Sequence, residues 1–347
     1  MLHAIDLAEH RCLPDSAVRW GIRRLLRRRL ADQGRIGGDA AERHMQSFVA
    51  QLQASPLRVA ADEANQQHYE VPAEFFQCCL GRRLKYSCCL FDQPGTTLDA
   101  AEEAMLRLTC QRAELADGTN ILELGCGWGS LSLWMAQQYP TARIVAVSNS
   151  HKQKQFIQSG LRQLGLSNLQ VITADMADFQ IDRQFDRVVS VEMFEHMRNY
   201  EELQRRIAGW LKPDGKLFVH VFCHETFAYL FETNGKANWM GRHFFTGGMM
   251  PSADLLPRFH RHLQLEHQWR VDGTHYGRTA EAWLNNLDAQ DAEIEEIFAA
   301  DMPRSQARLQ VQRWRMFFMA CAELFSFDEG RQWRVAHYRF HRSPDMY

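Results

Sequence analysis

The chain has 347 residues, of which 46% are hydrophobic, enough for one large core or for one core with an accessory lobe. Its formal net charge is −2, so the overall charge does not favour nucleic acid or an acidic membrane as a partner. No apolar run approaches the roughly 20 residues that cross a bilayer. The nine cysteines show no CxxC or Cys/His spacing, so we expect no metal site, no structural disulfide, and a cytoplasmic location.

Residues 1–65 are predicted to form a helical N-terminal extension. Within it, Ala17–Leu30 has the pattern of a basic amphipathic helix, with Val18, Ile22 and Leu26 near one face and arginines around the rest. Such a helix can bind a membrane surface or an acidic partner, or it can pack on the core. The chain has no second membrane signal, which favours packing on the core.

The middle of the chain alternates short apolar runs with helical patterns. This order predicts βαβ units and a mainly parallel α/β sheet with helices on both faces. Pro213-Asp214-Gly215 is predicted to be a turn just before the fifth strand. The predicted strands cover 121–124, 143–147, 169–172, 185–191 and 216–222, and the predicted helices cover 131–138, 152–164 and 200–211.

After the fifth strand the pattern changes. Residues 224–260 are rich in loop signals, and two helices over about 279–300 and 304–326 are predicted between strands at 263–271 and 332–339. This arrangement suggests an antiparallel edge hairpin that carries a lid. We therefore expect a catalytic domain over 66–347, with a substrate-lid insertion at about 224–330.

A glycine-rich loop between the first strand and its helix is the strongest functional signal. Gly125, Gly127 and Gly129 allow a tight turn and a close approach of a ligand to the backbone. Such a loop alone could also hold NAD or FAD. However, the spacing is GxGxG, and the preceding Glu123 would repel a pyrophosphate but could orient the cationic S-adenosylmethionine (SAM). Capping of the loop amides is a less favoured role for Glu123, because this residue interrupts an apolar strand. We therefore predict SAM as the cofactor.

Further cofactor contacts are predicted where the next two strands end. The second strand lacks the usual terminal Asp or Glu that holds the ribose hydroxyls, but Asn149 and Gln153 can form hydrogen bonds with a diol. Asp175 and Met176 follow the third strand, where the carboxylate can accept a hydrogen bond from the adenine amino group.

An acidic cluster, Glu192, Glu195 and His196, follows the fourth strand. Carboxylates can hold an ammonium ion and stabilise developing positive charge, and a histidine can accept a proton from a methylated amine. On a helical turn Glu192 and Glu195 would share a face. The same residues could be an ordinary acidic helix start. Their place at the end of a strand in an open α/β sheet favours the catalytic role.

In combination, several motifs resemble the cyclopropane-fatty-acyl synthase superfamily of SAM-dependent enzymes. They are His68-Tyr69, Tyr86-Ser87-Cys88, the loop 124–129, Ser148-Asn149-Ser150 with Gln153, and Phe194-Glu195-His196. The branch of coclaurine and pavine N-methyltransferases is more similar still, through Tyr86-Ser87-Cys88-Cys89, Asn199-Tyr200 and Ala322-Glu323-Leu324-Phe325. The resemblance covers nearly the whole chain. It implies the class I (Rossmann-like) methyltransferase fold, with Tyr86 and Ser87 among the residues that contact SAM.

Two positions distinguish the branches. Glu192 is typical of the N-methyltransferases, whereas the cyclopropane synthases have a small residue there. His220 instead resembles the cyclopropane synthases, whose bicarbonate-binding residues also match Cys88, Glu195 and Tyr276.

We expect an N-methyltransferase that acts on a small alkaloid-like amine, with a lipid-modifying cyclopropane synthase as the alternative. A SAM-binding regulator is disfavoured, because the acidic cluster would then have no role. Neither nucleic acid nor stable membrane insertion is expected, and a homodimer is a further expectation. The candidate substrate contacts are Cys88, His220, Tyr276 and Phe244, the last as part of an aromatic group with Trp239, Phe245 and Trp314.

Overall fold

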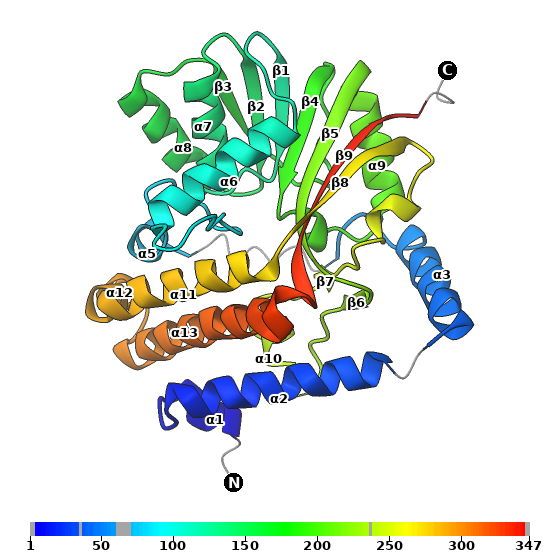
Figure 1. Ribbon diagram of the computed structural model, residues 1–347. Coiled ribbons are helices and arrows are strands. Elements are labelled where there is room, and N and C mark those ends of the chain that lie inside the picture. Colours follow the sequence, from blue (N-terminus) through cyan, green and yellow to red (C-terminus); the bar gives the residue numbers. More distant parts are fainter. Residues whose placement is uncertain (1–3, 35–36, 60–70, 236–237, 344–347) are drawn as a thin grey trace.

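A seven-stranded sheet forms the centre of the molecule (Figure 1). The computed structural model describes residues 4–34, 37–59, 71–235 and 238–343. The strands lie in the order β3-β2-β1-β4-β5-β9-β8, and β1 to β5 run parallel to one another. Their bounds are β1 (Asn120–Leu124), β2 (Arg143–Ser148), β3 (Leu169–Thr173), β4 (Phe185–Val191), β5 (Leu211–His224), β8 (Leu263–Val271) and β9 (Trp333–Arg342).

The predicted α/β fold and its parallel strands are confirmed, with two differences in detail. First, β5 begins at Leu211 and not after the Pro-Asp-Gly turn. Phe185 pairs with Leu211 and Arg187 pairs with Lys216, so the turn bulges out within the ladder instead of preceding it. Second, β9 is the strand that runs antiparallel to β5, and it lies inside the sheet between β5 and β8. The edge strand is β8, which pairs antiparallel with β9.

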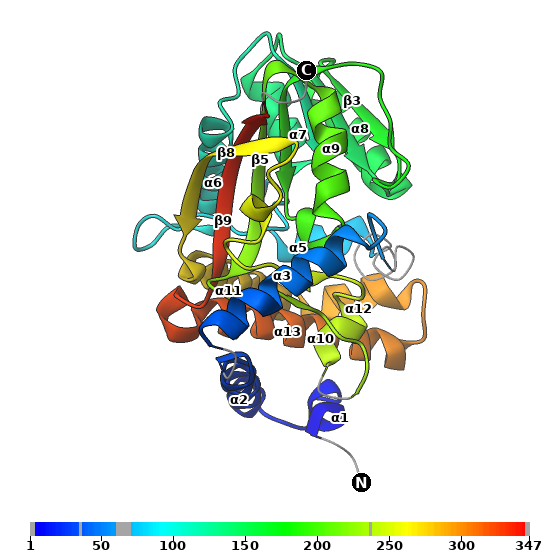
Figure 2. The ribbon, with the colours of Figure 1, turned by 90° about the vertical axis from the view of Figure 1, so that its right-hand side faces the viewer.

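Helices cover both faces of this sheet, as Figure 2 shows for α6 and α9. On one face, apolar side chains of three helices pack with strand residues: α6 (Leu98–Arg112), α7 (Ser130–Gln138) and α8 (His151–Leu164). On the other face, the core includes side chains of α3 (Asp39–Gln53) and α9 (Tyr200–Trp210). Side-chain caps define two helix starts, since Ser150 accepts a hydrogen bond from the amide of Gln153 and Asn199 accepts one from Glu202.

A helical lid separates β8 from β9, as predicted from the order of strands and helices at the end of the chain. It consists of α11 (Gly273–Ala289), α12 (Asp291–Ala299) and α13 (Arg304–Ser326), followed by the short η4 (Phe327–Gly330). The single helix predicted over 279–300 is therefore wrong, because the chain breaks at Gln290 and α11 begins earlier, capped by Asp272. The early start contains Gly273, where a Cβ would lie 2.1 Å from the carbonyl oxygen of Trp333. This glycine is needed for close packing rather than for a turn.

The segment between β5 and β8 is loop-rich, as predicted, and contains only short elements. They are β6 (Tyr229–Leu230), α10 (Trp239–His243), β7 (Met249–Met250) and η3 (Leu256–Arg258). β6 and β7 pair with each other as a separate two-stranded sheet. Apolar side chains of this segment join the core of the lid together with α5 (Ala73–Cys79).

The N-terminal helices α1 (Ala4–Glu9) and α2 (Asp15–Gly34) lie against the lid (Figures 1 and 2). The basic helix α2 contacts α13, and its apolar residues pack against the core of the lid. Arg19 forms ion pairs with Glu281 (2.5 Å) and Glu323 (3.1 Å). The packing interpretation of this helix is therefore confirmed. The boundary expected after residue 65, and the His68-Tyr69 motif, lie outside the described residues.

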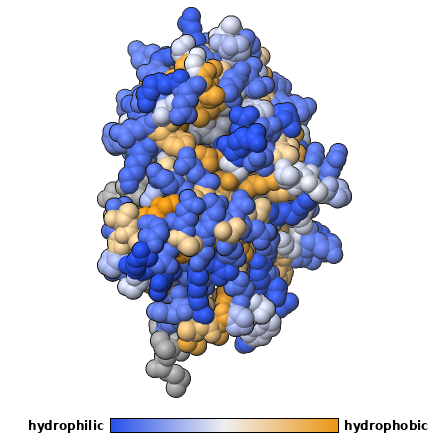
Figure 3. All heavy atoms as spheres, turned by 90° about the vertical axis from the view of Figure 1, so that its left-hand side faces the viewer, coloured by the Kyte–Doolittle hydropathy of each residue, from blue (hydrophilic) through white to orange (hydrophobic). Residues whose placement is uncertain are grey.

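Charged and polar residues cover most of the face shown in Figure 3, and hydrophobic residues form a broken band across its middle. Among the described residues, no helix combines the length and the apolar character that a membrane crossing requires.

Candidate active site

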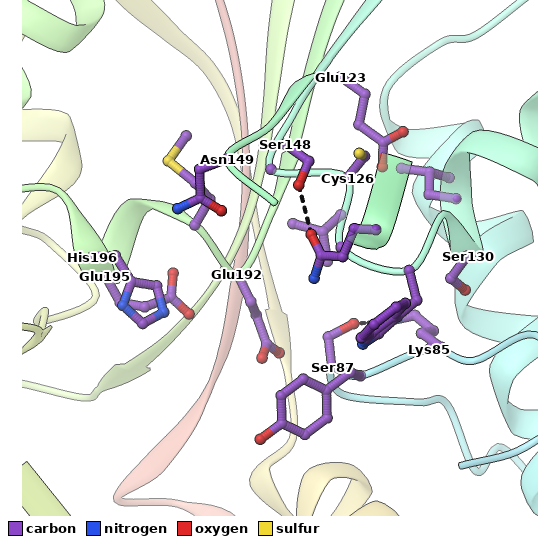
Figure 4. Close-up of a pocket in the computed structure, with 18 of the residues that line it drawn as sticks. Lys85, Ser87, Glu123, Cys126, Ser130, Ser148, Asn149, Glu192, Glu195 and His196 are labelled. Carbon is purple, nitrogen blue, oxygen red and sulfur yellow. Dashed lines mark hydrogen bonds between the residues drawn. The ribbon is translucent and has the colours of Figure 1, made fainter. Parts of the chain in front are cut away.

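A pocket opens at the carboxyl ends of β1, β2 and β4 (Figure 4). The strand order reverses between β1 and β4, which is where open α/β sheets bind ligands. The walls come from the glycine loop, the segments after β2 and β4, the loop before α6, and the lid. They include Gly127, Asn149, Glu192, Ser87 and Tyr276.

The three loop glycines have different tasks, although all have a positive φ angle that disfavours other residues. At Gly127 an added Cβ would meet nothing within 4 Å, and this residue lines the pocket. At Gly129 the Cβ would lie 2.5 Å from Ile157, so this glycine permits close packing of the loop on α8. Gly125 also lines the pocket and has Met193 directly behind it. The loop thus leaves room for a ligand at Gly127.

Glu123 lies beneath the loop and is 2% exposed. Its carboxylate accepts a hydrogen bond from the hydroxyl of Ser132 at the start of α7. Burial raises the pKa of Glu123 to about 7, because the charged form loses its hydration. A cationic ligand in this pocket would favour the ionised carboxylate, so the site is suited to one.

The predicted cofactor residues after β2 and β3 are only partly brought together. Asn149 and Gln153 both line the pocket, and the Ser148 hydroxyl lies 2.6 Å from Oε1 of Gln153. Met176 lines the pocket as well. The Asp175 carboxylate instead forms an ion pair with Arg58, and Arg58 is the pocket-lining member of this pair. Arg58 is therefore a pocket residue that the sequence motifs did not indicate.

The loop before α6 brings the buried Lys85, Tyr86 and Ser87 into the pocket wall. The Lys85 ammonium group donates to the hydroxyl of Ser87 and to the carbonyl oxygen of Cys88 (2.8 Å). Lys85 was not among the predicted site residues. The only signal in the sequence was its position directly before the Tyr86-Ser87-Cys88 motif.

Glu192 occupies the centre of the pocket in an uncommon backbone conformation, with φ at 47°. Its Oε1 accepts hydrogen bonds from the amide of Cys88 (3.0 Å) and from Nε2 of His220 (3.2 Å). Its Oε2 accepts one from the Tyr276 hydroxyl (2.6 Å). Burial raises the pKa of Glu192, and the nearby Lys85 charge and the hydrogen bonds from Tyr276 and the Cys88 amide oppose that rise.

Glu195 has a different environment, although it lies only three residues further on. It is 1% exposed, and neither carboxylate oxygen has a hydrogen-bond partner among the described residues. Burial and the charge of Glu192 raise its pKa well above the usual range. The short helix η2 (Phe194–His196) begins after Glu192, so the two glutamates do not lie on one helical turn and helical spacing does not place them on one face. Both nevertheless line the same pocket, together with His196 (Figure 4).

The predicted substrate contacts fall into two groups. Tyr276 lines the pocket and binds Glu192, whereas His220 and the amide of Cys88 contact Glu192 without lining the pocket, and burial raises the pKa of the Cys88 thiol well above its usual value. Phe244 instead stacks on Phe317 (4.2 Å between ring centroids) and is not among the pocket-lining residues. Its neighbour Phe245 lines the pocket and stacks on His196. Trp239 and Trp314 are buried in the core of the lid.

All nine cysteines are free thiols, and eight of them are buried. Within the described part of the chain, His, Cys, Asp and Glu side chains form no group of three or more that could hold a metal ion.

Comparison with known proteins agrees with this geometry. The family model for mycolic acid cyclopropane synthetase matches residues 58–334. (S)-Coclaurine N-methyltransferase of Thalictrum flavum subsp. glaucum is 37% identical over 332 residues, which cover 94% of this chain and 92% of that protein. Cyclopropane-fatty-acyl-phospholipid synthase of Escherichia coli K12 is 26% identical over 272 residues, 78% of this chain and 66% of that protein.

Among solved structures, coclaurine N-methyltransferase bound to N-methylheliamine and SAH superposes with a TM-score of 0.93 at 35% identity. The match covers 96% of this chain and 97% of that chain. The extent of these matches confirms the resemblance inferred from the sequence motifs. The chain belongs to the mycolic acid cyclopropane synthetase family, and within it to the side that resembles the coclaurine N-methyltransferases.

Proposed function

We propose that the chain is a SAM-dependent N-methyltransferase whose acceptor is the amine of a small, alkaloid-like molecule. The observation that carries this proposal is the placement of two buried carboxyl groups and a histidine in the same pocket as an open glycine loop. The coclaurine enzyme, similar over nearly all of both chains, supports the same reaction.

The pocket fits SAM at several points. The space at Gly127 admits a ligand against the backbone, and Asn149 and Gln153 offer polar side chains for a ribose diol. Glu192 provides negative charge for a cationic ligand, and binding of a cation favours ionisation of Glu123 as well. When bound, SAM supplies a methyl group activated by its positively charged sulfur.

Residues of the chain would then prepare the acceptor. An amine nitrogen becomes positive as its lone pair forms the new N–C bond, and the ionised Glu192 stabilises this charge. A bound ammonium ion also lowers the pKa of the orphaned Glu195, which would then release its proton and become a second counter-charge. His196, held against Phe245 at the pocket wall, can accept the N–H proton of the methylated amine.

His220 favours the lipid-modifying alternative, whereas Glu192 argues against it. The bicarbonate set implied by the resemblance includes His220, Tyr276 and Cys88. In this chain the His220 imidazole, the Tyr276 hydroxyl and the Cys88 amide all donate to the Glu192 carboxylate. A second anion would find these donors engaged and would be repelled by the carboxylate. This arrangement favours an amine acceptor.

A labelled-methyl assay tests the proposal. SAM carrying a labelled methyl group is incubated with the protein and either a panel of primary and secondary aromatic amines or unsaturated phospholipid vesicles, with and without bicarbonate. We expect label in the amine products. Label in phospholipid, stimulated by bicarbonate and absent from every amine, would move the assignment to the lipid branch.

His196→Ala probes the proton acceptor in the same assay. We expect it to lower kcat most at low pH, where less amine is unprotonated and a base matters more. A uniform loss across the pH range would assign His196 to binding rather than to proton transfer.

We further infer a cytoplasmic homodimer, with the catalytic domain beginning near residue 66. The nine free thiols support a reducing compartment. Light scattering on the purified protein and cell fractionation test these two assignments, and limited proteolysis tests the domain boundary.

A further inference from the structure

A chain of hydrogen bonds runs from Glu192 through the sheet to the end of α6. His220 on β5 and His337 on β9 are directly opposite each other in the antiparallel ladder. Nε2 of His337 lies 2.8 Å from Nδ1 of His220, and Nε2 of His220 lies 3.2 Å from Oε1 of Glu192. At the far end, Nη1 of Arg112 lies 2.8 Å from Nδ1 of His337. Both imidazoles are fully buried.

The direction of every bond in this chain follows from its two ends. A guanidinium group can only donate, so Nδ1 of His337 must accept from Arg112 and the proton of His337 must lie on Nε2. That proton is donated to Nδ1 of His220, which places the His220 proton on Nε2, facing Glu192. The tautomer of His220 is thus set by Arg112, two residues away along the chain of bonds.

The chain is not an exit route for protons. Burial and the charge of Arg112 lower the pKa of both histidines well below the usual value, so both are neutral. The terminal Arg112 has no lone pair with which to accept a proton from His337. Arg112 itself is held over the ring of Trp269. Trp269 lies on β8, directly opposite His337 on β9. The residues therefore form a fixed line of donors that all point towards Glu192.

We propose that His337 and Arg112 are positioning residues that hold the N–H of His220 on Glu192 and so keep Glu192 ionised while the amine is methylated. The inference rests on the proposed function for the role of Glu192, but the tautomers themselves do not depend on it. The other titratable or charged groups that face or lie near Glu192 are Lys85, Cys88, Cys89, Glu195, Tyr276 and, from α13, Cys321.

The first test reads the tautomers directly. Nitrogen-15 NMR of the histidine rings distinguishes Nε2–H from Nδ1–H, and we expect Nε2–H for His220 and His337 in the SAM-free protein. In His337→Phe, which keeps a ring but loses the donor, the His220 ring should lose this fixed tautomer. His337→Gln, whose amide can donate to Nδ1 of His220, should restore it. Nδ1–H on His220 in the native protein, or an unchanged His220 in His337→Phe, would overturn the proposal.

His224→Phe is the matched control. His224 is also a buried histidine on β5, but its Nδ1 accepts hydrogen bonds from the amides of Thr226 and Phe227 and it does not contact Glu192. This variant should lower the melting temperature and leave the His220 signals unchanged. It therefore separates a loss of core packing from a loss of the donor chain.

The second test is the pH dependence of amine methylation. In His337→Phe, Glu192 loses a hydrogen bond that favours its charged form, so its pKa should rise. The acidic limb of the kcat/KM profile should therefore move to a pH about one unit higher, and kcat/KM at pH values below the limb should fall about tenfold. His337→Gln should return the limb towards its native position. Arg112→Met, which keeps an unbranched side chain but loses the donors to His337, should move it in the same direction as His337→Phe. If His337→Phe melts earlier but keeps the native limb, as His224→Phe should, the role of His337 is structural and the proposal fails. If the proposed function itself is wrong, the native protein will methylate no amine in the labelled-methyl assay, a result that differs from every outcome above.

Discussion

Glu192→Gln separates the charge of the central carboxylate from its geometry. The glutamine carbonyl oxygen can take the place of Oε1 and keep the hydrogen bonds from the Cys88 amide and His220. The new amide group then faces the Tyr276 hydroxyl, which can rotate to accept. The substitution therefore removes the negative charge and keeps the side chain in place.

The expected loss follows from what the charge contributes. A hydrogen bond to a charged group contributes about 1.5–3 kcal/mol, so kcat/KM for the amine should fall about 10- to 150-fold. The melting temperature should change little, because the loss of the attraction to Lys85 is offset by the removal of a buried charge that folding must desolvate. SAM affinity measured by calorimetry should change much less than kcat/KM.

Asp186→Asn is the matched control for this variant. Asp186 lies on β4 as well, but near its other end, where it accepts hydrogen bonds from Lys212 and Asn120. This substitution should leave kcat/KM near the native value. If Glu192→Gln methylates the amine as fast as the native protein over the whole pH range, the carboxylate does not stabilise the developing charge and the reasoning is refuted.

Three further predictions concern the cofactor loop and the thiols. Gly127→Val should abolish SAM binding in a calorimetric titration, because its side chain enters the ligand space, whereas Gly209→Ala, at an open position in α9, should bind normally. A folded Gly127→Val protein with native affinity would remove the loop from the site. In the SAM-free protein, the pKa of Glu123 is raised from 4.5 to about 7, so the native state holds a proton that the unfolded state has lost. The contribution of Glu123 to the free energy of unfolding therefore falls as the pH rises from 4.5 to about 7. Urea unfolding should show that the free energy of unfolding of Glu123→Gln, relative to that of the native protein, rises by up to about 3 kcal/mol between pH 5 and pH 8. An equal difference at both pH values would contradict the buried acid. Chelator and reductant should leave methylation unchanged, since the cysteines are free and the described residues offer no metal-ligand group; a loss of activity on removing zinc or magnesium would contradict this expectation.

The strands of the parallel sheet were predictable because each is a short apolar run bounded by turns. β4 agrees with its prediction at both ends, and β1, β2 and β3 each differ from their predictions by one residue at one end. The division of the lid at Gln290 was not predictable, because helical periodicity continues across it and the early start of α11 contains two glycines. Close packing against β9 and α13 decides this region, and sequence pattern does not report such packing.

The site was predictable where its residues follow strands directly, as at Gly127, Glu192 and Glu195. Contacts between distant parts of the chain were not predictable. Lys85 and His337 join Glu192 only because the loop before α6 and the last strand converge on β4 and β5. Phe244 and Phe245 show the same limit on a smaller scale, since adjacent residues point to different sides and only the fold decides which one faces the pocket.

The lid leaves the sheet at the end of β8 and returns at the start of β9, two strands that are hydrogen-bonded neighbours. Its two attachment points are therefore fixed close together, and the helices between them can diverge without altering the strand order. The glycine loop and the acidic cluster lie on the sheet side, whereas Tyr276 and Phe317 come from the inserted helices. Substitutions in the inserted helices can therefore reshape one wall of the pocket while the glycine loop and the acidic cluster keep their places, so one scaffold can accommodate molecules of different size and polarity.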